Sequence, residues 1–382
     1  MIPYGRQDIT EDDIEAVVAT LRSDFLTQGP AVPRFEKVVA DHVGAAHAVA
    51  VNSATSALHI ACLALGLGPG DWLWTSPNTF VASANCALYC GARVDFVDID
   101  PTTYNLSVEA LTRKLEVAER EGRLPKIVVP VHLCGQSCDM SAIAELAKRF
   151  QFKVIEDASH AIGGKYRNDP VGNCRYSDIT IFSFHPVKIV TTAEGGMALT
   201  NDAALAAKLA LLRSHGITRD PALMVHGSQG PWYYEQIELG FNYRMTDIQA
   251  ALGVSQMDRI EAYVARRHAL ARRYDALLDG LPLTRPMQAV DTYSAYHLYP
   301  VRVPGSDRLR VFESLREAGI GVNVHYIPVH LHPYYQAMGF KPGDYPEAER
   351  YYAEAISLPL YPTLTEAQQD RVVAALRSAM GT

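Results

Sequence analysis

Short apolar runs alternate with amphipathic helical patterns along the chain between Val51 and Thr200. Runs of this length are typical of buried strands, and the helices between them cover both faces of the sheet that such strands form. We expect strands over residues 73–76, 93–97, 126–132, 153–157, 179–183 and 196–199, separated by helices over 55–65, 81–89, 107–121, 141–150 and 202–213. The alternation predicts an α/β domain built on a large, mainly parallel sheet.

A long helical pattern over residues 246–278 leads into the C-terminal part of the chain. Beyond it we expect a strand over 296–303, a helix over 306–318, a strand over 322–327 and a last helix over 365–380. A chain of 382 residues exceeds the size at which a single core stops growing. We therefore predict a large domain over residues 1–250, and the connecting helix with a smaller α+β domain over residues 251–382.

Charge and composition argue against several classes of partner. The net charge is −7 and the sequence has no dense Lys/Arg run, which argues against nucleic acid or an acidic membrane surface. The first 20 residues are acidic and lack the pattern of a signal peptide. No apolar run reaches the roughly 18 residues that a membrane span requires. We therefore expect a cytoplasmic protein. The pairs Cys86/Cys90 and Cys134/Cys138 have C-x3-C spacing rather than a zinc pattern, so we expect buried free thiols and no metal.

Lys188 follows a buried strand, with Phe184 and Pro186 before it and the pair Gly195-Gly196 after it. Neighbouring residues of this kind can exclude water from an amine, which lowers the pKa of the amine. The neutral amine, which is the form that makes a Schiff base, is then more abundant. The alternative is a solvated loop lysine, because most lysines lie in water. Lys188 taken alone leaves both interpretations open.

Two other segments favour a cofactor site. Asp157 ends a buried strand at the carboxyl edge of the sheet, where open α/β folds bind ligands, and a carboxylate there would keep the pyridine nitrogen of pyridoxal phosphate protonated. Asn52-Ser-Ala-Thr-Ser-Ala57 opens a helix whose free N–H groups and positive dipole end suit a phosphate. The alternatives are that Asp157 only caps the next helix and that residues 52–57 are an ordinary capped helix start.

These three segments occur in an order that resembles the fold-type I pyridoxal-phosphate enzymes and, within them, the DegT/DnrJ/StrS sugar aminotransferase family. The resemblance covers essentially the whole chain, and it is strongest to members of the pseudaminic acid pathway. The strings that carry it are Leu26-Thr-Gln-Gly29, Asn52-Ser-Ala-Thr-Ser-Ala-Leu58, Asp157-Ala-Ser-His-Ala161, Phe182-Ser-Phe-His-Pro-Val-Lys188, Thr191-Thr-Ala-Glu-Gly-Gly196, Leu212-Arg-Ser-His-Gly-Ile217, Gly240-Phe-Asn-Tyr-Arg-Met245, His297-Leu-Tyr-Pro300 and Val324-His-Tyr326.

The resemblance implies a role for each matching residue. Lys188 would hold pyridoxal phosphate as a Schiff base and move protons, Asp157 would pair with the ring nitrogen, and His160 would lie near the ring. The remaining cofactor positions are Ala54, Thr55 and Ser183 at the phosphate, Phe80 stacked on the ring, and Asn242 reaching the phosphate from the neighbouring subunit of a homodimer. The positions that would line the nucleotide-sugar site are Tyr4, Asp24, Phe25, Leu26, Thr27, Asn323, Val324, His325 and Tyr326.

The reaction that the resemblance implies moves an amino group from L-glutamate to the C4 ketone of a nucleotide-linked 4-keto-6-deoxy sugar. The expected sugar is UDP-2-acetamido-2,6-dideoxy-beta-L-arabino-hexos-4-ulose, and 2-oxoglutarate is the other product. A perosamine- or bacillosamine-type 4-keto sugar is the alternative substrate.

Three competing functions lack their sequence features. Deoxygenating relatives place histidine where Lys188 stands, and a non-catalytic nucleotide-sugar binding or regulatory protein on this fold would be expected to have lost Lys188 or Asp157. A dinucleotide-dependent enzyme would need G-x-G-x-x-G directly after a strand. The nearest candidate, Gly66-Leu-Gly-Pro-Gly70, follows a helix and is typical of a helix end.

Overall fold

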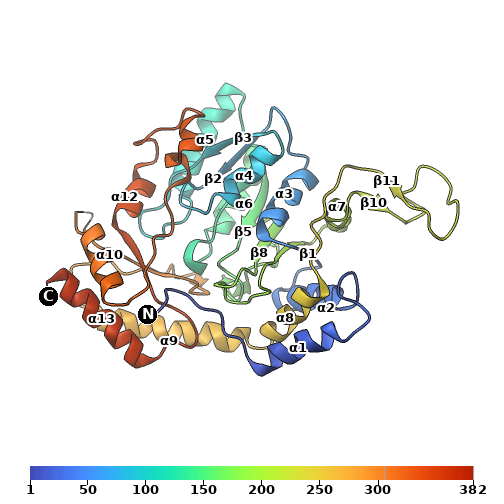
Figure 1. The fold of residues 1–382 in the computed structure, drawn as a ribbon. Coiled ribbons are helices and arrows are strands. Elements are labelled where there is room, and N and C mark those ends of the chain that lie inside the picture. The colour runs from blue at the N-terminus through green and yellow to red at the C-terminus, as the bar shows by residue number, and fades with distance from the viewer. Residues whose placement is uncertain (305, 382) are drawn as a thin grey trace.

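The computed structural model describes residues 1–304 and 306–381, and a seven-stranded sheet forms its centre (Figure 1). The strand order is β1-β9-β8-β5-β4-β2-β3. The strands are β1 (His47–Val51), β2 (Trp72–Thr75), β3 (Arg93–Phe96), β4 (Ile127–Val129), β5 (Lys153–Asp157), β8 (Ile179–Ser183) and β9 (Gly196–Thr200). All pairs from β3 to β8 are parallel, which confirms the predicted mainly parallel sheet.

Strands β1 and β9 depart from the expected pattern. Strand β9 runs antiparallel to both β8 and β1, with Ser183 and Val51 each opposite Gly196. Parallel neighbours need a crossover connection, usually a helix, whereas β8 and β9 are joined by the loop of residues 184–195. The chain therefore turns back at Lys188. Strand β1 was not among the predicted strands, and its partner β9 lies about 150 residues further along the chain, at positions 196–200.

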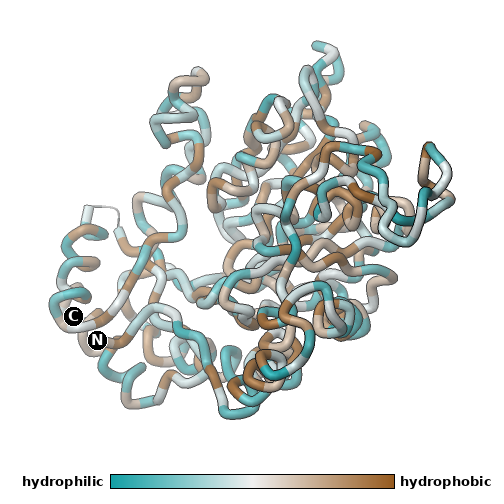
Figure 2. The backbone as a smooth tube through the Cα atoms, turned by 45° about the vertical axis from the view of Figure 1, so that its right-hand side comes forward, coloured by the Kyte–Doolittle hydropathy of each residue, from teal (hydrophilic) through white to brown (hydrophobic). Residues whose placement is uncertain are grey.

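Helices cover both faces of the sheet. Strand β4 contributes side chains to an apolar core on each face of the sheet. Ile127 and Val129 belong to one core, and Val128 belongs to the other. The first face is covered by α3 (Ala54–Ala64), α4 (Ala82–Tyr89) and α7 (Ala203–Arg213), and the second by α5 (Val108–Glu121) and α6 (Met140–Phe150). Figure 2 shows hydrophobic segments within the body and largely hydrophilic outer turns.

The predicted helix over residues 246–278 is two helices, α8 (Asp247–Met257) and α9 (Ile260–Leu277). The break falls at Arg259, which leaves the helical region at φ −109° and ψ 3°. Its guanidinium bonds the buried Asp13 of α1 (Glu11–Leu21) at 2.6 Å and Tyr263 at 2.9 Å. Helix α8 packs on α1 and α2 (Ala31–Val43), so these contacts, rather than the local sequence pattern, decide where the helix breaks.

The C-terminal part has its own apolar core around an antiparallel pair, β13 (Tyr299–Arg302) and β14 (Ala355–Leu358). Helices α10 (Arg308–Glu317) and α13 (Glu366–Met380) match their predictions, and α11 (Pro333–Gln336) and α12 (Pro346–Glu354) lie between them. The predicted strand over 322–327 does not form. Only Asn323 bridges Ser357, and the next residues turn into a pocket beside the large sheet.

Three short strand pairs and two 3-10 turns complete the described chain. They are β6 (Lys165–Tyr166) with β7 (Asp169–Pro170) and β12 (Thr292–Tyr293), β10 (Ile217–Thr218) with β11 (Glu235–Gln236), and the turns Leu133–Gly135 and Val329–Leu331. The β10–β11 segment projects from the body as an arm (Figure 1). Among the described residues, none of the helices has the length and apolar character that crossing a membrane requires.

Candidate active site

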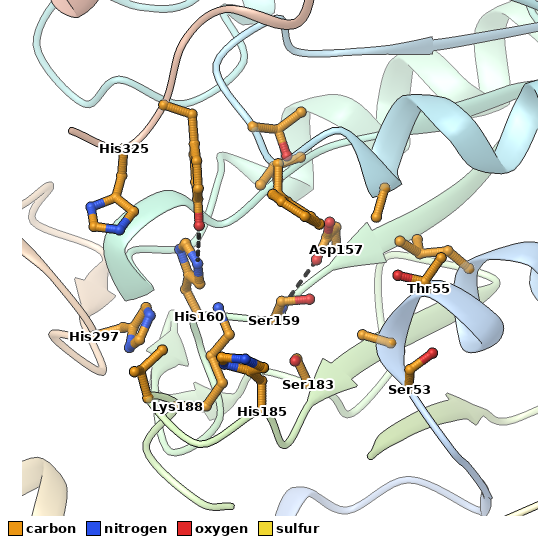
Figure 3. Close-up of a pocket in the computed structure, with 18 of the residues that line it drawn as sticks. Ser53, Thr55, Asp157, Ser159, His160, Ser183, His185, Lys188, His297 and His325 are labelled. Carbon is orange, nitrogen blue, oxygen red and sulfur yellow. Dashed lines mark hydrogen bonds between the residues drawn. The ribbon is translucent and has the colours of Figure 1, made fainter. Parts of the chain in front are cut away.

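A pocket of about 510 Å³ opens at the carboxyl ends of β5 and β8, beside the first residues of α3. This is the edge at which open α/β sheets bind ligands. Its lining includes twelve of the predicted site residues: Tyr4, Ala54, Thr55, Phe80, Asp157, His160, Ser183, Lys188, Asn323, Val324, His325 and Tyr326. Segments from the two ends of the chain therefore meet the large sheet at one cavity (Figure 3).

Asp157 is the last residue of β5 and is only 5% exposed. One carboxylate oxygen accepts a hydrogen bond from the Ser83 hydroxyl at 2.6 Å, and the other accepts one from the Ser159 backbone N–H at 3.1 Å. The strand end is fixed as well, because the backbone of Asp157 bonds those of Pro130 and His132. The carboxylate is thus held in one orientation at the pocket wall, which the alternative of a helix cap does not require.

The start of α3 forms the opposite end of the pocket. Ser53 caps the helix by accepting a hydrogen bond from the N–H of Ser56, and Ala54 and Thr55 follow at the cavity wall. The first N–H groups of a helix have no partner within the helix, so they remain available to an anion. The Thr55 and Ser183 side chains line the same end of the cavity (Figure 3).

Gly196 allows this helix start to approach β9 closely. A Cβ atom at residue 196 would lie 2.4 Å from the Ala54 nitrogen and 2.5 Å from the Ser53 carbonyl. Such contacts are far inside van der Waals distance, so only glycine fits here. Gly196, the second residue of the glycine pair after the lysine loop, thus allows the start of α3 to pack closely against β9.

Lys188 lies on the loop between β8 and β9 and extends into the pocket (Figure 3). Hydrogen bonds between Phe184 and both Gly195 and Thr192 close the loop at its base. Burial lowers the pKa of the Lys188 amine to about 8, and the nearby negative charge of Asp157 opposes that shift. Lys188 is half-buried and lies in a pocket with the Asp157 carboxylate, which favours a partly desolvated amine over a fully solvated loop lysine.

Four histidines line the pocket around Lys188, and three of them, His160, His297 and His325, are buried (Figure 3). The rings of His160 and His297 are 4.3 Å apart between centroids, and His325 bonds the Ser357 hydroxyl at 2.8 Å. Burial, together with the positive charge of Lys188, lowers the pKa of all three, that of His325 to about 3. The imidazoles are consequently neutral at physiological pH.

Five predicted site residues lie outside the pocket of this single chain. Residues 24–27, which are Asp24, Phe25, Leu26 and Thr27, form an exposed turn after α1 and are tied to α8 through a backbone bond from Asp247 to Leu26. Asn242 is exposed beside the base of the arm, where it bridges Ser214. A single chain does not bring these residues to Lys188, so their roles remain predictions.

The sequence did not indicate several residues that support the site. Ser83 and Ser159 hold Asp157, and His297 lies beside Lys188 in the pocket (Figure 3). Ser159 and His297 lie inside the strings that resemble the family, so proximity in the sequence could have suggested them. Ser83 lies on α4, 74 residues from Asp157, and only the packing of that helix brings the two together.

Pyridoxal phosphate fits the groups that line this pocket. The free helix N–H groups at Ala54 and Thr55 suit its phosphate, and the fixed carboxylate of Asp157 suits a protonated pyridine nitrogen. The partly desolvated amine of Lys188 suits its aldehyde. The three requirements are met by backbone and side-chain groups of three separate segments around one cavity.

None of the cysteines lines the pocket, although the backbone N–H of Cys134 donates to His160, which does. All six cysteines are free thiols, and Cys134 is the partly exposed one while the other five are buried. Within residues 1–304 and 306–381, no three His, Cys, Asp or Glu side chains are arranged to hold a metal ion.

Known proteins of similar sequence agree with this geometry. The model of the DegT/DnrJ/EryC1/StrS aminotransferase family matches residues 7–377. The spore coat polysaccharide biosynthesis protein SpsC of Bacillus subtilis is 42% identical, over 98% of this chain and 96% of SpsC. The uncharacterized protein MJ1066 of Methanocaldococcus jannaschii is 39% identical, over 98% of this chain and 97% of its own length.

Solved structures of sugar aminotransferases share the whole fold. PseC of Helicobacter pylori, an aminotransferase involved in the biosynthesis of pseudoaminic acid, matches with a TM-score of 0.91 and 30% identity over 100% of this chain and 99% of PseC. The putative sugar aminotransferase Spr1654 of Streptococcus pneumoniae, in its PMP-form, matches with a TM-score of 0.90 and 30% identity, over 100% and 99% of the two chains. This chain is therefore a sugar aminotransferase and belongs to the DegT/DnrJ/EryC1/StrS aminotransferase family.

Proposed function

We propose that this chain transfers an amino group from L-glutamate to the C4 ketone of a nucleotide-linked 4-keto-6-deoxy sugar. The observation that carries the proposal is the convergence of Lys188, Asp157 and the start of α3 on one pocket. The cofactor is pyridoxal phosphate, as expected for the family, and Spr1654 is known in both a PLP-form and a PMP-form. When bound, it supplies the aldehyde that accepts the amino group and the ring that takes up electrons during proton transfer.

Different residues of this chain would bind the phosphate, the ring nitrogen and the ring face of the cofactor. Ala54, Thr55 and Ser183 would hold the phosphate, Asp157 would keep the ring nitrogen protonated, and Phe80 would cover the ring. Ser83 keeps the Asp157 carboxylate facing the pocket, because its hydroxyl donates to one of the two oxygens. These contacts fix the position of the ring before either substrate arrives.

Lys188 has a second role once glutamate has displaced its amine. A primary amine with a pKa of about 8 is present in both the neutral and the protonated form near neutral pH. It could therefore move a proton between the reacting carbon of the substrate and C4′ of the cofactor, and general acid–base transfer of this kind contributes roughly 10²–10⁴-fold. The neutral histidines beside it do not add positive charge that would repel its protonated form.

The identity of the sugar is the finer part of the proposal. Similarity to PseC supports UDP-2-acetamido-2,6-dideoxy-beta-L-arabino-hexos-4-ulose, the substrate expected in pseudaminic acid biosynthesis. The alternative is another nucleotide-linked 4-keto sugar, of the perosamine or bacillosamine type. The similarity to SpsC, a polysaccharide biosynthesis protein that is 42% identical, keeps this alternative open, since PseC and Spr1654 are both 30% identical.

The functional unit that we propose is a homodimer with shared active sites. Asn242 is exposed at the base of the arm, where a second subunit could bring it to the phosphate end of the pocket. The arm also carries exposed apolar side chains, among them Leu223, Val225, Trp232 and Leu239. Exposed patches of this kind commonly mark protein interfaces.

A substrate panel tests the proposed reaction. The purified protein, loaded with pyridoxal phosphate, is incubated with L-glutamate and with UDP-, GDP- and dTDP-linked 4-keto sugars, and amino sugar and 2-oxoglutarate are measured together. We expect equal amounts of the two products with the UDP-linked 2-acetamido sugar. Formation of amino sugar only from a perosamine- or bacillosamine-type 4-keto sugar, whichever nucleotide carries it, would support the alternative, and absence of amino transfer to any sugar in the panel would contradict the proposal.

A further inference from the structure

Two hydrogen bonds of His160 leave the proton of one pocket hydroxyl, that of Tyr326, unengaged. The backbone N–H of Cys134 donates to Nδ1 of His160 at 3.3 Å. That nitrogen must therefore present a lone pair, and a neutral His160 carries its proton on Nε2. Burial and the charge of Lys188 lower the pKa of His160 well below its usual value, which keeps the ring neutral.

The proton on Nε2 determines the role of Tyr326. Nε2 of His160 lies 3.2 Å from the Tyr326 hydroxyl oxygen, and Figure 3 draws this bond at His160 as a dashed line. Since Nε2 is the donor, the phenol oxygen is the acceptor. The phenol proton is therefore free to be donated elsewhere, and the described chain forms no other hydrogen bond with this hydroxyl. Tyr326 lines the same pocket as Lys188, so that proton is available to a ligand.

The surroundings of the phenol keep it protonated. Burial raises the pKa of Tyr326, and the negative charge of Asp157 raises it further. The group can thus donate a hydrogen bond at any physiological pH, but it does not become a base. A fixed donor with these properties suits an oxygen atom that gains negative charge during a reaction.

Resting on the proposed function, we propose that the Tyr326 hydroxyl donates a hydrogen bond to the carbonyl oxygen of the keto substrate that is being aminated, with His160 as the positioning residue that directs it. When an amine adds to this carbonyl, a carbon–nitrogen bond forms and the π electron pair moves onto the oxygen. The nitrogen loses a proton, which Lys188 accepts and passes to the oxygen. The phenol keeps its own proton and stabilises the oxygen while its charge develops.

The carbonyl can belong to the sugar or to 2-oxoglutarate, and the two half-reactions distinguish these sources. Tyr326→Phe keeps the ring and removes only the hydroxyl. The absorbance of the bound cofactor is followed in single turnovers, first with glutamate or 2-oxoglutarate and then with the keto sugar. We expect the rate of at least one half-reaction to fall about 100-fold, the usual cost of one such donor, with cofactor affinity and thermal stability unchanged.

Tyr345→Phe is the matched control, because it removes a phenol hydroxyl that bonds Asp95 outside the pocket. It should leave both half-reactions at the wild-type rate. Wild-type rates for Tyr326→Phe in both half-reactions would overturn the inference, as would a loss explained entirely by weaker cofactor binding. If the wild-type protein performed neither half-reaction, the proposed function itself would fail, so the two failures are distinguishable.

A double-mutant cycle tests the role of His160. His160→Leu removes the Nε2–H donor and leaves the phenol free to rotate, so it should slow the same half-reaction in the wild-type background. The loss should be at least fivefold smaller when Tyr326 is already phenylalanine, because residues that act as one unit are not additive. His160→Gln, which offers an amide N–H in place of the imidazole N–H, should recover part of the rate. Fully additive losses would show that His160 does not act through Tyr326.

Discussion

At the residue scale, Lys188 combines two opposing influences. Removal from water favours the neutral amine, while Asp157 in the same pocket favours the charged one, and burial is the stronger effect because the pKa falls to about 8. An ordinary lysine would be almost entirely charged at pH 8, since its pKa is about 10.4. The pocket therefore makes Lys188 a nucleophile under conditions in which the solvated lysines of the chain are not.

This shift predicts how cofactor loading depends on pH. The pKa of Lys188 is lowered, so its neutral fraction increases as the pH rises through about 8. The rate at which cofactor-free protein regains its imine absorbance with pyridoxal phosphate should rise from pH 6.5 and level off above pH 9. Loading of Lys188→Arg, which keeps the charge, should show no such rise. A rate that still increases between pH 9 and pH 11 would mean that the amine is solvated and that our description of the pocket is wrong.

The sequence pattern indicated Lys188 and Asp157 as candidates but not the residues that support them. Asp157 ends β5 and Lys188 lies in the loop that follows β8, and the carboxyl edge of a sheet is a position that a linear pattern can indicate. Ser83 could not be found in this way, because its contact with Asp157 depends on the packing of α4 against the sheet. The direction of the Tyr326 hydroxyl depends on a backbone N–H at residue 134, which no side-chain motif encodes.

At the element scale, the close contact between β9 and α3 places the lysine loop against the phosphate end. Gly196→Ala would set a Cβ atom 2.4 Å from the Ala54 nitrogen, so the helix start must shift. We expect the variant to lose about 1–3 kcal/mol of stability, as overpacked sites do, and to bind pyridoxal phosphate at least tenfold more weakly. Equilibrium unfolding and cofactor titration measure the two effects.

Gly68→Ala is the control for that variant, because a Cβ atom at residue 68 would meet nothing within 4 Å. It should change neither stability nor cofactor affinity appreciably. If Gly196→Ala kept wild-type affinity, the close contact would not govern the position of the phosphate site.

The fold was predictable wherever local pattern and tertiary packing agree. Strands β5 and β8 occur at their predicted positions because each is a short apolar run between turns. The existence of β1 and the direction of β9 depend on the pairing of two neighbouring strands that are about 150 residues apart in the sequence, which the linear pattern does not contain. Likewise, the break between α8 and α9 follows from the ion pair of Arg259 with Asp13, and these residues are 246 positions apart.

At the scale of the whole molecule, the proposed dimer explains why Asn242 lies outside the pocket of its own chain. Mixing inactive Lys188→Ala with inactive Asn242→Ala under subunit exchange tests it. In a mixed dimer with shared sites, one site carries both lesions and the other carries neither. Activity should then return towards about one quarter of wild type, since roughly half of the dimers are mixed and each has one intact site of two.

The control is the same mixing without conditions for exchange, which should restore no activity. Asn242→Ala must also be substantially impaired alone for the experiment to be informative. No recovery in mixtures that demonstrably contain mixed dimers would mean that Asn242 acts within its own subunit or serves only the fold.

We propose that Lys188 binds pyridoxal phosphate covalently. Reduction of the loaded protein with borohydride, followed by proteolysis and peptide mapping, tests this bond because reduction makes an imine permanent. We expect loss of the imine absorption band and recovery of the pyridoxyl group on a peptide that contains Lys188, with Lys188→Ala giving no such peptide. Recovery of the label on another lysine, or the absence of any imine band after addition of pyridoxal phosphate, would show that Lys188 does not hold the cofactor.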